Sequence, residues 1–273
     1  MHLRAACIQL QGSSDLERNL SVSEAAIREA AAQGATLIAT PEATDYLGPH
    51  KAKADIAEAL DGPRALRWSS LARELQITLL VGSVAERCTQ GPPANTSLLF
   101  SPSGALQAHY RKLHLFDVDV PGGVRFSESR TTTPGDRIVS APIPGSHLGL
   151  SICYDLRFPP LYQALRDQGA EILAVPSAFT ARTGEAHWEV LLRARAIETQ
   201  CFVLAPGHWG PHDDQGLRES WGHSCIIDPW GRVLAEQATG EGFCIADLDL
   251  QALRELRARM PVWEHRRLPL DGG

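Results

Sequence analysis

The chain has 273 residues, of which 44% are hydrophobic and 21% are charged, and its formal net charge at pH 7 is −6. This acidic balance argues against a general affinity for nucleic acid, and no stretch approaches the ~20 apolar residues of a membrane helix. The N-terminal sequence MHLRAACIQLQG lacks the basic and then apolar run of a secretory signal, so we expect a cytoplasmic protein.

The first half of the chain alternates short apolar runs with segments of helical periodicity. Strands are predicted at 4–10, 36–40, 77–86, 96–100 and 105–111, and helices from Leu16 to a stop at Gly34 and over 64–75. The turn SPSG joins the last two strands as a hairpin. A Gly-, Pro-, Ser- and Thr-rich loop of about 30 residues begins at Leu113, and a loop this long in a compact domain is usually functional.

The second half repeats the alternation. Strands are predicted at 147–153, 171–177, 201–206, 223–228, 232–237 and 242–249, and helices at 159–169, 184–200 and 250–259. The sequence shows no linker, low-complexity tract or internal repeat, so residues 1–273 are predicted to form one α/β domain with mixed strands covered by helices.

Cysteine and lysine usage is informative. The six cysteines form no metal-ligand spacing, which indicates a reducing compartment, and four lie in apolar runs where burial is expected: Cys7, Cys201, Cys225 and Cys244. Only three of the 26 basic residues are lysines. Lys51 and Lys53 lie in the polar stretch PHKAKAD and are expected to be solvated, whereas Lys112 lies between apolar segments.

Three reactive side chains follow three predicted strands. Glu42 follows 36–40, Lys112 follows 105–111, and Cys153 ends 147–153. Ligands in open α/β sheets bind beyond the carboxyl ends of the strands, so these groups converge if the strands are neighbours. Each has an ordinary alternative, because a lone carboxylate or amine after a strand is usually solvated and a lone cysteine is usually part of the core.

Together the three groups would make a chemical unit. A Glu42 carboxylate whose pKa is raised by an apolar pocket could take the proton of Cys153 as its sulfur attacks. Lys112 could hold the oxyanion that forms on a carbonyl or nitrile, and the backbone N–H of Tyr154 is the natural second donor.

Two other constellations stay open. A Cys–His pair could use His109 or His114 as its base, although no third group to orient the imidazole is evident. A metal site can be drawn from residues of one polar loop, although lining of a substrate mouth fits them better: His208, His212, Asp213 and Asp214. There is no GxSxG, GxGxxG or Walker motif.

The segments PEATDYLG, YRKLHLFDVDVPGG and SICYDLRFPPLYQAL resemble the three catalytic motifs of the nitrilase superfamily, the carbon–nitrogen hydrolases. The resemblance extends through PSAFTARTGEAHWEVLLRARAIETQCFV, GHSCIIDPWGRVLAE and MPVWEHRR, and it is greatest to the Nit branch and its deaminated glutathione amidases.

The resemblance implies a four-layer αββα sandwich that forms homodimers, with the helix at 184–200 in the interface and a packing or interface role for His187 and Trp188. It assigns Glu42 as base, Lys112 as oxyanion stabiliser and Cys153 as nucleophile. Glu128 in RFSESRTTTPGD matches a second glutamate of the family. The mechanism it implies uses no metal and no organic cofactor.

The activity implied is hydrolysis of a small-molecule amide, with release of ammonia and deaminated glutathione as the expected substrate. Cations for the substrate carboxylates would come from arginines near the motifs: Arg125, Arg157 and Arg182. The alternatives are an ω-amidase for 2-oxo-dicarboxylic acid amides, an N-carbamoyl hydrolase, a nitrilase, and a binding or scaffold protein without turnover.

Overall fold

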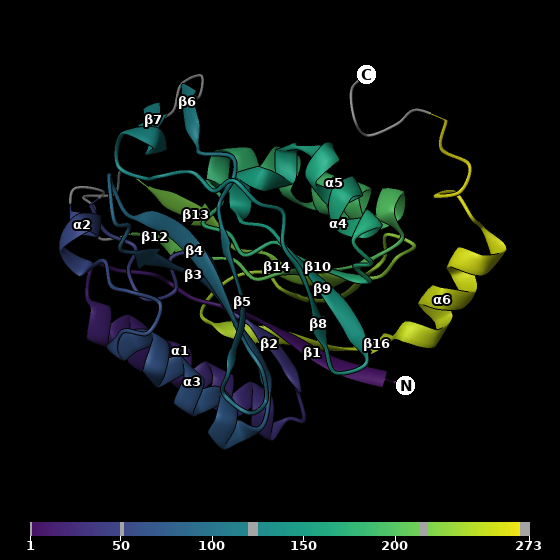
Figure 1. Cartoon of the computed structure of the whole chain (residues 1–273), viewed down its shortest axis with the longest axis horizontal. Helices are drawn as coiled ribbons and strands as arrows, with labels where there is room; N and C mark the ends of the chain where they lie inside the picture. The colour runs from purple at the N-terminus through teal and green to yellow at the C-terminus, as the bar shows by residue number, and fades with distance from the viewer. Residues whose placement is uncertain (1, 50–51, 120–124, 213–217, 268–273) are drawn as a thin grey trace.

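Two six-stranded sheets lie face to face at the centre of the molecule (Figure 1). The computed structural model describes residues 2–49, 52–119, 125–212 and 218–267. The first sheet has the order β16-β1-β2-β3-β4-β5, and its strands are β1 (His2–Gln9), β2 (Leu37–Ala39), β3 (Thr78–Glu86), β4 (Ala94–Phe100), β5 (Leu106–Arg111) and β16 (Gly242–Asp249). The second has the order β15-β14-β11-β10-β9-β8, and its strands are β8 (Ser140–Ile143), β9 (Ser146–Leu150), β10 (Ile172–Ala174), β11 (Phe202–Ala205), β14 (Ser224–Ile227) and β15 (Val233–Gln237).

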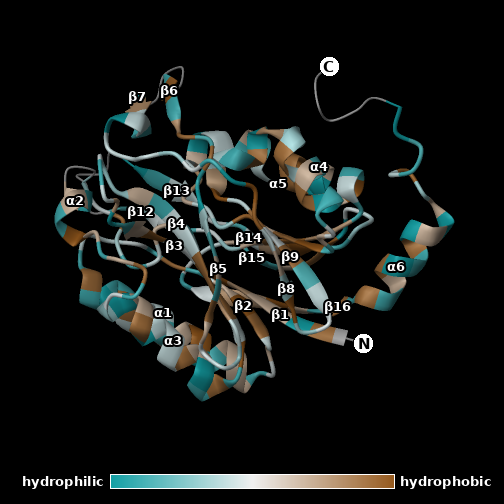
Figure 2. Cartoon of the chain, viewed as in Figure 1, coloured by the Kyte–Doolittle hydropathy of each residue, from teal (hydrophilic) through white to brown (hydrophobic). Residues whose placement is uncertain are grey.

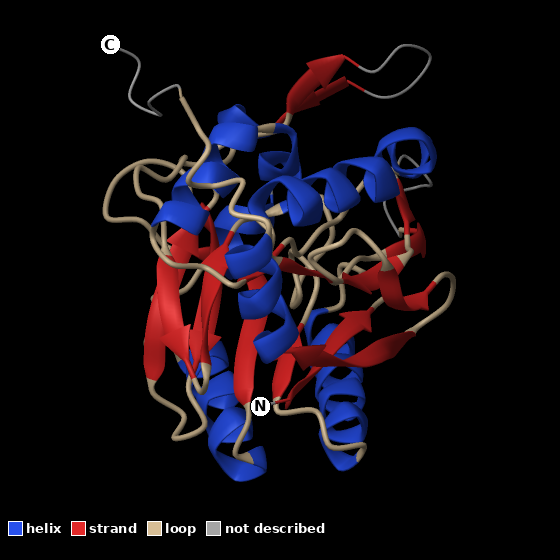
Figure 3. Ribbon diagram, turned by 90° about the vertical axis from the view of Figure 1, so that its right-hand side faces the viewer, coloured by secondary structure: helices blue, strands red, loops and turns tan. Residues whose placement is uncertain are grey.

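Each sheet carries a pair of helices on its outer face, so the layers run helix, sheet, sheet, helix (Figures 1 and 3). The pair on the first sheet is α1 (Leu16–Ala32) and α3 (Pro63–Leu75), and the pair on the second is α4 (Pro159–Asp167) and α5 (Ala181–Thr199). This arrangement confirms the αββα sandwich. A further helix, α6 (Leu250–Arg259), follows β16 and lies at the side of the sandwich.

The helix boundaries follow from local chemistry. The Asp15 side chain accepts a hydrogen bond from the Arg18 N–H at 3.0 Å and so caps α1. Gly34, with a φ of +90°, ends that helix as the sequence predicts. Proline stands in the first turn of α3 and of α4, where its missing N–H is not needed.

The core forms two apolar layers, visible as the brown strands of Figure 2. One lies between α1, α3 and the first sheet, around Trp68 and Ile38. The other fills the space between the sheets and continues under α4 and α5, around Leu204 and Trp188. The four cysteines expected to be buried are all in the core: Cys7, Cys201, Cys225 and Cys244.

Parallel strands at the centre of each sheet direct their carboxyl ends to one side of the molecule. The parallel pairs are β1–β2 and β2–β3 in one sheet and β9–β10 and β10–β11 in the other. The short helix α2 (Lys53–Ile56) and the hairpin of β12 (Trp209–Pro211) and β13 (Glu219–Trp221) lie on that side (Figure 1).

The sequence analysis did not predict these short elements, nor β8 or the hairpin of β6 (Asp117–Asp119) and β7 (Arg125–Ser127). Strand β9 also ends at Leu150, before the predicted end, because Cys153 opens a 3₁₀ turn. Within the described ranges, no helix has the length and apolar character needed to cross a bilayer.

Candidate active site

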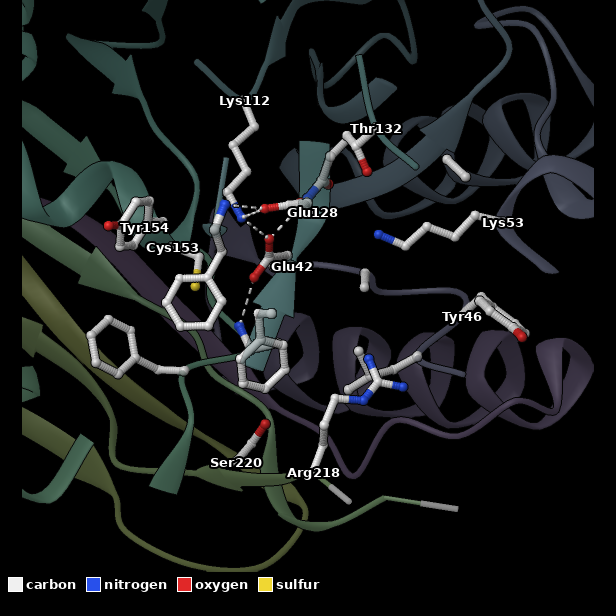
Figure 4. Close-up of a pocket in the computed structure, with 18 of the residues that line it drawn as sticks. Glu42, Tyr46, Lys53, Lys112, Glu128, Thr132, Cys153, Tyr154, Arg218 and Ser220 are labelled. Atoms are coloured by element: carbon white, nitrogen blue, oxygen red, sulfur yellow. Dashed lines mark hydrogen bonds and ion pairs between the residues drawn. The ribbon is translucent and has the colours of Figure 1, made fainter. Parts of the chain in front are cut away.

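Glu42, Lys112, Glu128 and Cys153 meet in one pocket at the carboxyl ends of the strands (Figure 4). All four side chains are buried. Glu42 follows β2, Lys112 follows β5, Glu128 opens a 3₁₀ turn after β7, and Cys153 opens another after β9. The convergence predicted from the strand exits is therefore present.

Lys112 lies between two carboxylates. Its Nζ donates to Glu42 Oε1 at 2.8 Å and to Glu128 Oε2 at 3.0 Å. The Asn95 side-chain amide also donates to Glu42 Oε1, at 2.8 Å. Backbone N–H groups complete the set, because Ala178 donates to Glu42 Oε2 at 2.9 Å and Phe116 donates to Glu128 Oε2 at 2.7 Å.

These contacts determine the charges. Burial alone would raise the pKa of the Glu42 carboxyl, but the charge of Lys112, with the hydrogen bonds from Lys112 and Ala178, brings that pKa below its ordinary value. The same balance, in which Lys112 and Lys53 oppose burial, lowers the pKa of Glu128 to about 2. The expectation of a raised pKa for Glu42 is therefore wrong, because the hydrogen-bonded ammonium of Lys112 and the Ala178 N–H outweigh the effect of burial.

The Cys153 thiol is neutral in this setting. Burial raises the pKa of the thiol well above its ordinary value, and the Glu42 charge raises it further, while Lys112 offsets only part of the shift. Lys112 stays charged, because Glu128 and Glu42 together outweigh its burial and raise its pKa. The site thus pairs a protonated thiol with an ionised carboxylate, which suits transfer of the proton as the sulfur attacks.

The backbone at Cys153 has a left-handed conformation, with a φ of +49°. Its N–H donates to the carbonyl of Pro176 at 2.9 Å. The Tyr154 N–H follows at the start of the 3₁₀ turn, and N–H groups at such a position have no partner within the turn. It is therefore available in principle to an oxyanion.

The Asp155 side chain holds the 3₁₀ turn that begins at Cys153 in place. The side chain is fully buried and accepts from the Ile152 N–H at 2.8 Å and from the Tyr110 hydroxyl at 2.7 Å. It also accepts from the His114 N–H at 3.0 Å and lies 2.7 Å from His114 Nδ1. Asp155 therefore connects the segment after Lys112 to the turn that carries Cys153.

This contact bears on the Cys–His alternative. Asp155 is the orienting group that the sequence analysis did not find, but the His114 ring is stacked on Phe158 with 3.7 Å between centroids. Neither His114 nor His109 is among the residues that line the pocket. Glu42 is the group that bears on the thiol.

The loop histidines have structural partners. His208 Nε2 lies 2.7 Å from the Glu42 carbonyl, and His208 Nδ1 accepts from the Gly12 N–H at 3.2 Å. His212 lies 2.9 Å from the Gly12 carbonyl and 2.8 Å from Ser220 Oγ. His208 therefore orients the backbone of Glu42. Asp213 and Asp214 lie outside the described residues, and among those described no cluster of metal-binding side chains is present.

The pocket walls place the remaining candidates. Tyr154 and Arg157 line the pocket, and the Arg157 guanidinium lies 5.9 Å from the Tyr154 ring centre and 5.2 Å from that of Phe179. Arg125 on β7 and Arg182 in the first turn of α5 are exposed and do not line it. Trp188 packs against Phe179 with 5.0 Å between ring centres, as expected, and His187 is exposed with Nδ1 3.3 Å from Arg157.

Two pocket cations were missed. Lys53 on α2 and Arg218 before β13 both line the pocket (Figure 4). The expectation that Lys53 is solvated is wrong, because α2 folds over the pocket and leaves the side chain half-buried there. Lys51 lies outside the described residues. The scarcity of lysine was the one available signal for Lys53, since each lysine of this Arg-rich chain needed an explanation.

Comparison with known proteins supports these observations. The family model described as carbon–nitrogen hydrolase matches residues 4–258. Human deaminated glutathione amidase is 44% identical over 99% of this chain and 84% of its own length. Human omega-amidase NIT2 is 41% identical over 98% of this chain and 96% of its own length.

Solved structures agree. The Caenorhabditis elegans NitFhit protein superposes with a TM-score of 0.92 at 39% identity, over 98% of this chain and 66% of that one. A glutamate-to-glutamine mutant of an amidase from Nesterenkonia superposes with a TM-score of 0.78 at 27% identity, over 95% of each chain. That structure shows the acetamide moiety of fluoroacetamide added covalently at its active-site cysteine.

The Asp155 network yields a stability prediction. Asp155→Asn replaces an acceptor-only carboxylate with an amide whose NH₂ faces hydrogen-bond donors, so we expect the free energy of unfolding to fall by about 2–3 kcal/mol. Urea unfolding measures this, with the exposed Asp136→Asn as control, for which a change within about 0.5 kcal/mol is expected. Equal stability of the two variants would contradict the role assigned to Asp155.

Proposed function

Because the chain belongs to the carbon–nitrogen hydrolase family, we propose that its substrate is deaminated glutathione and that Cys153, Glu42, Lys112 and Glu128 carry out the hydrolysis. The observation that carries the residue roles is the convergence of a neutral thiol, an ionised carboxylate and a charged amine in one buried pocket. The chain is an amidase that acts on carbon–nitrogen bonds other than peptide bonds, and its 1–273 sequence is proposed to form a single hydrolase domain.

The proposed reaction has two halves. Cys153 Sγ attacks the amide carbonyl while Glu42 accepts the thiol proton, and Lys112 and the Tyr154 N–H hold the oxyanion. Glu42 then gives the proton to the nitrogen, the C–N bond breaks, and the acyl group remains as a thioester. Water that gives its proton to Glu42 attacks the thioester, the C–S bond breaks, and the carboxylic acid leaves as the thiol regains its proton.

Glu128 is proposed to position Lys112 rather than to react. Its carboxylate holds Nζ on the side opposite Glu42, and its own pKa of about 2 keeps it ionised. A second buried carboxylate also supports the charge of Lys112 while Glu42 is transiently neutral.

The leaving group depends on the substrate. The expected release of ammonia applies only to primary amides, such as those that an ω-amidase cleaves. The amide bonds of deaminated glutathione are secondary, so its cleavage releases an amine instead. The ω-amidase alternative stays open, because the chain is 41% identical to human omega-amidase NIT2. Arg157 is the arginine best placed for a carboxylate on the acyl part in either case, because it lines the pocket beside Tyr154 and Phe179.

We also propose a homodimer formed through α5 and the segment between β14 and β15. Val190 and Ile197 lie on one face of α5 and are 68% and 47% exposed, and Trp230 is 55% exposed. Arg193 Nε donates to the Gly231 carbonyl at 2.8 Å, so these apolar side chains belong to one continuous surface. An exposed apolar strip of this kind is typical of an interface. A cytoplasmic location is proposed from the sequence alone.

Exchange of the nucleophile tests the proposed function. Cys153→Ser keeps size and polarity, so we expect a folded protein whose kcat/KM for deaminated glutathione falls at least about 10³-fold. Release of 2-oxoglutarate measures the activity, and Cys88→Ser, which lies outside the pocket, is the control. Alkylation by fluoroacetamide should map to Cys153 by mass spectrometry. An acyl adduct on another cysteine would overturn the assignment, and turnover of 2-oxoglutaramate alone would favour the ω-amidase.

The pH dependence separates Glu42 from a histidine base. The pKa of Glu42 is lowered from 4.5, so the base stays ionised, and kcat/KM is retained, as the pH falls from 8 to about 5. The pKa of Cys153 is raised above 9.0, so kcat/KM does not rise between pH 7 and 9 as a thiolate forms. Initial rates across this range measure both limbs. Loss of activity with an apparent pKa near about 6.5 would instead indicate an imidazole base.

Introducing negative charges into the exposed apolar strip on α5 tests the proposed dimer. Val190→Glu together with Ile197→Glu places two carboxylates in the apolar strip without touching the core, so we expect a monomer in light scattering at concentrations where the unaltered protein is a dimer. The control is Glu189→Gln on the same helix. A dimer that survives both substitutions would place the interface elsewhere.

A further inference from the structure

The peptide group that joins Glu42 to Ala43 is held at both of its polar atoms. Its carbonyl oxygen lies 2.7 Å from His208 Nε2, and its N–H donates to Ser83 Oγ at 2.7 Å. Ser83 lies on β3 of the first sheet, whereas His208 follows β11 of the second. Both residues are buried, so the backbone beside the proposed base is fixed from the two sheets at once.

An extra residue in β3 aims Ser83 at this peptide. Gly82 and Ser83 together lie opposite the single residue Ser97 of β4, which is the pattern of a β-bulge. A Cβ at Gly82 would collide with the carbonyl oxygens of Thr40 and Pro41, so glycine is needed where β3 approaches the segment that leads to the base. Ser97 Oγ donates to the Gly82 carbonyl and so provides a partner for it within the bulge.

The contacts of His208 determine which ring nitrogen carries the proton. Burial lowers the pKa of His208 to about 4, so the ring is neutral at pH 7 and has one N–H. Nδ1 accepts from the Gly12 N–H at 3.2 Å, which places the proton on Nε2, facing the Glu42 carbonyl. Nδ1 also lies 3.1 Å from the Leu10 carbonyl, but a proton there would leave two acceptors facing each other across the shorter 2.7 Å contact. His208 is thus a fixed N–H donor.

The conformation of Ala43 explains why this peptide has to be held. Its φ of +53° lies in the left-handed region, where a residue with a side chain persists only if its surroundings impose that conformation. Without the two hydrogen bonds the peptide is free to rotate toward an ordinary conformation, and the Glu42 side chain would move with it. In the proposed reaction the carboxylate must reach first the Cys153 sulfur and then the scissile nitrogen. A displacement of about 1 Å can cost about 10²-fold in rate.

We propose that Ser83 and His208 form a peptide clamp, a pair of positioning residues that keep the base Glu42 in its reactive place by holding the peptide bond that follows it. The inference rests on the proposed mechanism and deepens it. Glu42 and Ala43 line the pocket, whereas Ser83 and His208 do not. The clamp therefore acts through Glu42, and its loss should lower kcat while leaving KM nearly unchanged.

Removal of either half of the clamp tests the proposal. Ser83→Ala leaves the Ala43 N–H without its acceptor, and His208→Leu leaves the Glu42 carbonyl without its donor. We expect kcat for deaminated glutathione to fall about 10- to 100-fold in each variant, with KM within about twofold of the unaltered value. His208→Gln restores an N–H donor and should keep kcat within about fivefold of the unaltered protein.

The matched control is Ser23→Ala, which removes an equally buried serine hydroxyl on α1, away from the pocket, and should leave kcat unchanged. A purely structural role gives a different pattern. Lower stability of Ser83→Ala and His208→Leu in urea unfolding, with kcat of the folded protein unchanged, would overturn the clamp. Equal losses of kcat in His208→Gln and His208→Leu would do the same, because the N–H would then not matter.

Alkylation of Cys153 tests the clamp without any substrate. Burial and then the Glu42 charge raise the pKa of the Cys153 thiol, so a displaced carboxylate should lower that pKa and speed the reaction with iodoacetamide at about pH 8. We expect the rate constant to rise at least about threefold in Ser83→Ala and His208→Leu, with Glu42→Gln as the upper reference. His208→Gln should react as slowly as the unaltered protein.

The buried core cysteines Cys7 and Cys201 control for unfolding in the same experiment, because they should stay unlabelled in the mass spectrum while the fold is intact. If the unaltered protein does not hydrolyse deaminated glutathione, the proposed substrate fails, and the alkylation rates still decide the clamp. Equal rates for Cys153 in Ser83→Ala, His208→Leu and the unaltered protein would overturn it.

Discussion

The site depends on one buried ammonium held between two carboxylates. Burying charges is costly unless each is paired and hydrogen-bonded, and loss of one partner from such a set leaves an uncompensated charge that costs about 3–5 kcal/mol. The two carboxylates meet this condition because the Asn95 amide and the backbone N–H groups of Ala178 and Phe116 donate to them in addition to Lys112. Glu42 follows a strand of one sheet and Ala178 follows a strand of the other, so the cluster also ties the two sheets together.

The same cluster distributes the protons. An amine at this distance keeps Glu42 ionised, and burial with a facing negative charge keeps the Cys153 thiol protonated. A thiolate is therefore not stored before substrate arrives. Its formation is coupled to attack on the carbonyl, when the negative charge passes to an oxygen that Lys112 can hold. The ordinary pKa values of a carboxyl and a thiol already differ in this direction, and the surroundings of Glu42 and Cys153 widen the difference.

Much of this could be predicted from the sequence. Alternating apolar runs gave the order of the main strands and helices, and their carboxyl ends led to Glu42, Lys112 and Cys153. The direction of the Glu42 pKa shift could not be predicted, because it depends on a hydrogen bond from Lys112, which lies 70 residues away in the sequence. Lys53 and Arg218 were missed for a similar reason: both lie in polar segments whose local pattern is that of solvated loops, and only the packing of α2 and the β12–β13 hairpin brings them to the pocket. Asp155 was hidden because three of its four contacts join segments more than 40 residues apart, and only the contact with the Ile152 N–H is local.

The left-handed backbone at Cys153 lowers the stability of the fold at the residue that the proposed reaction needs. A side chain at a φ of +49° costs of order 1 kcal/mol, and glycine would relieve it. Selection for thermal persistence alone would therefore remove the sulfur from this position, whereas selection for turnover keeps it. A glycine at position 153 would therefore raise the free energy of unfolding and remove the nucleophile in the same substitution.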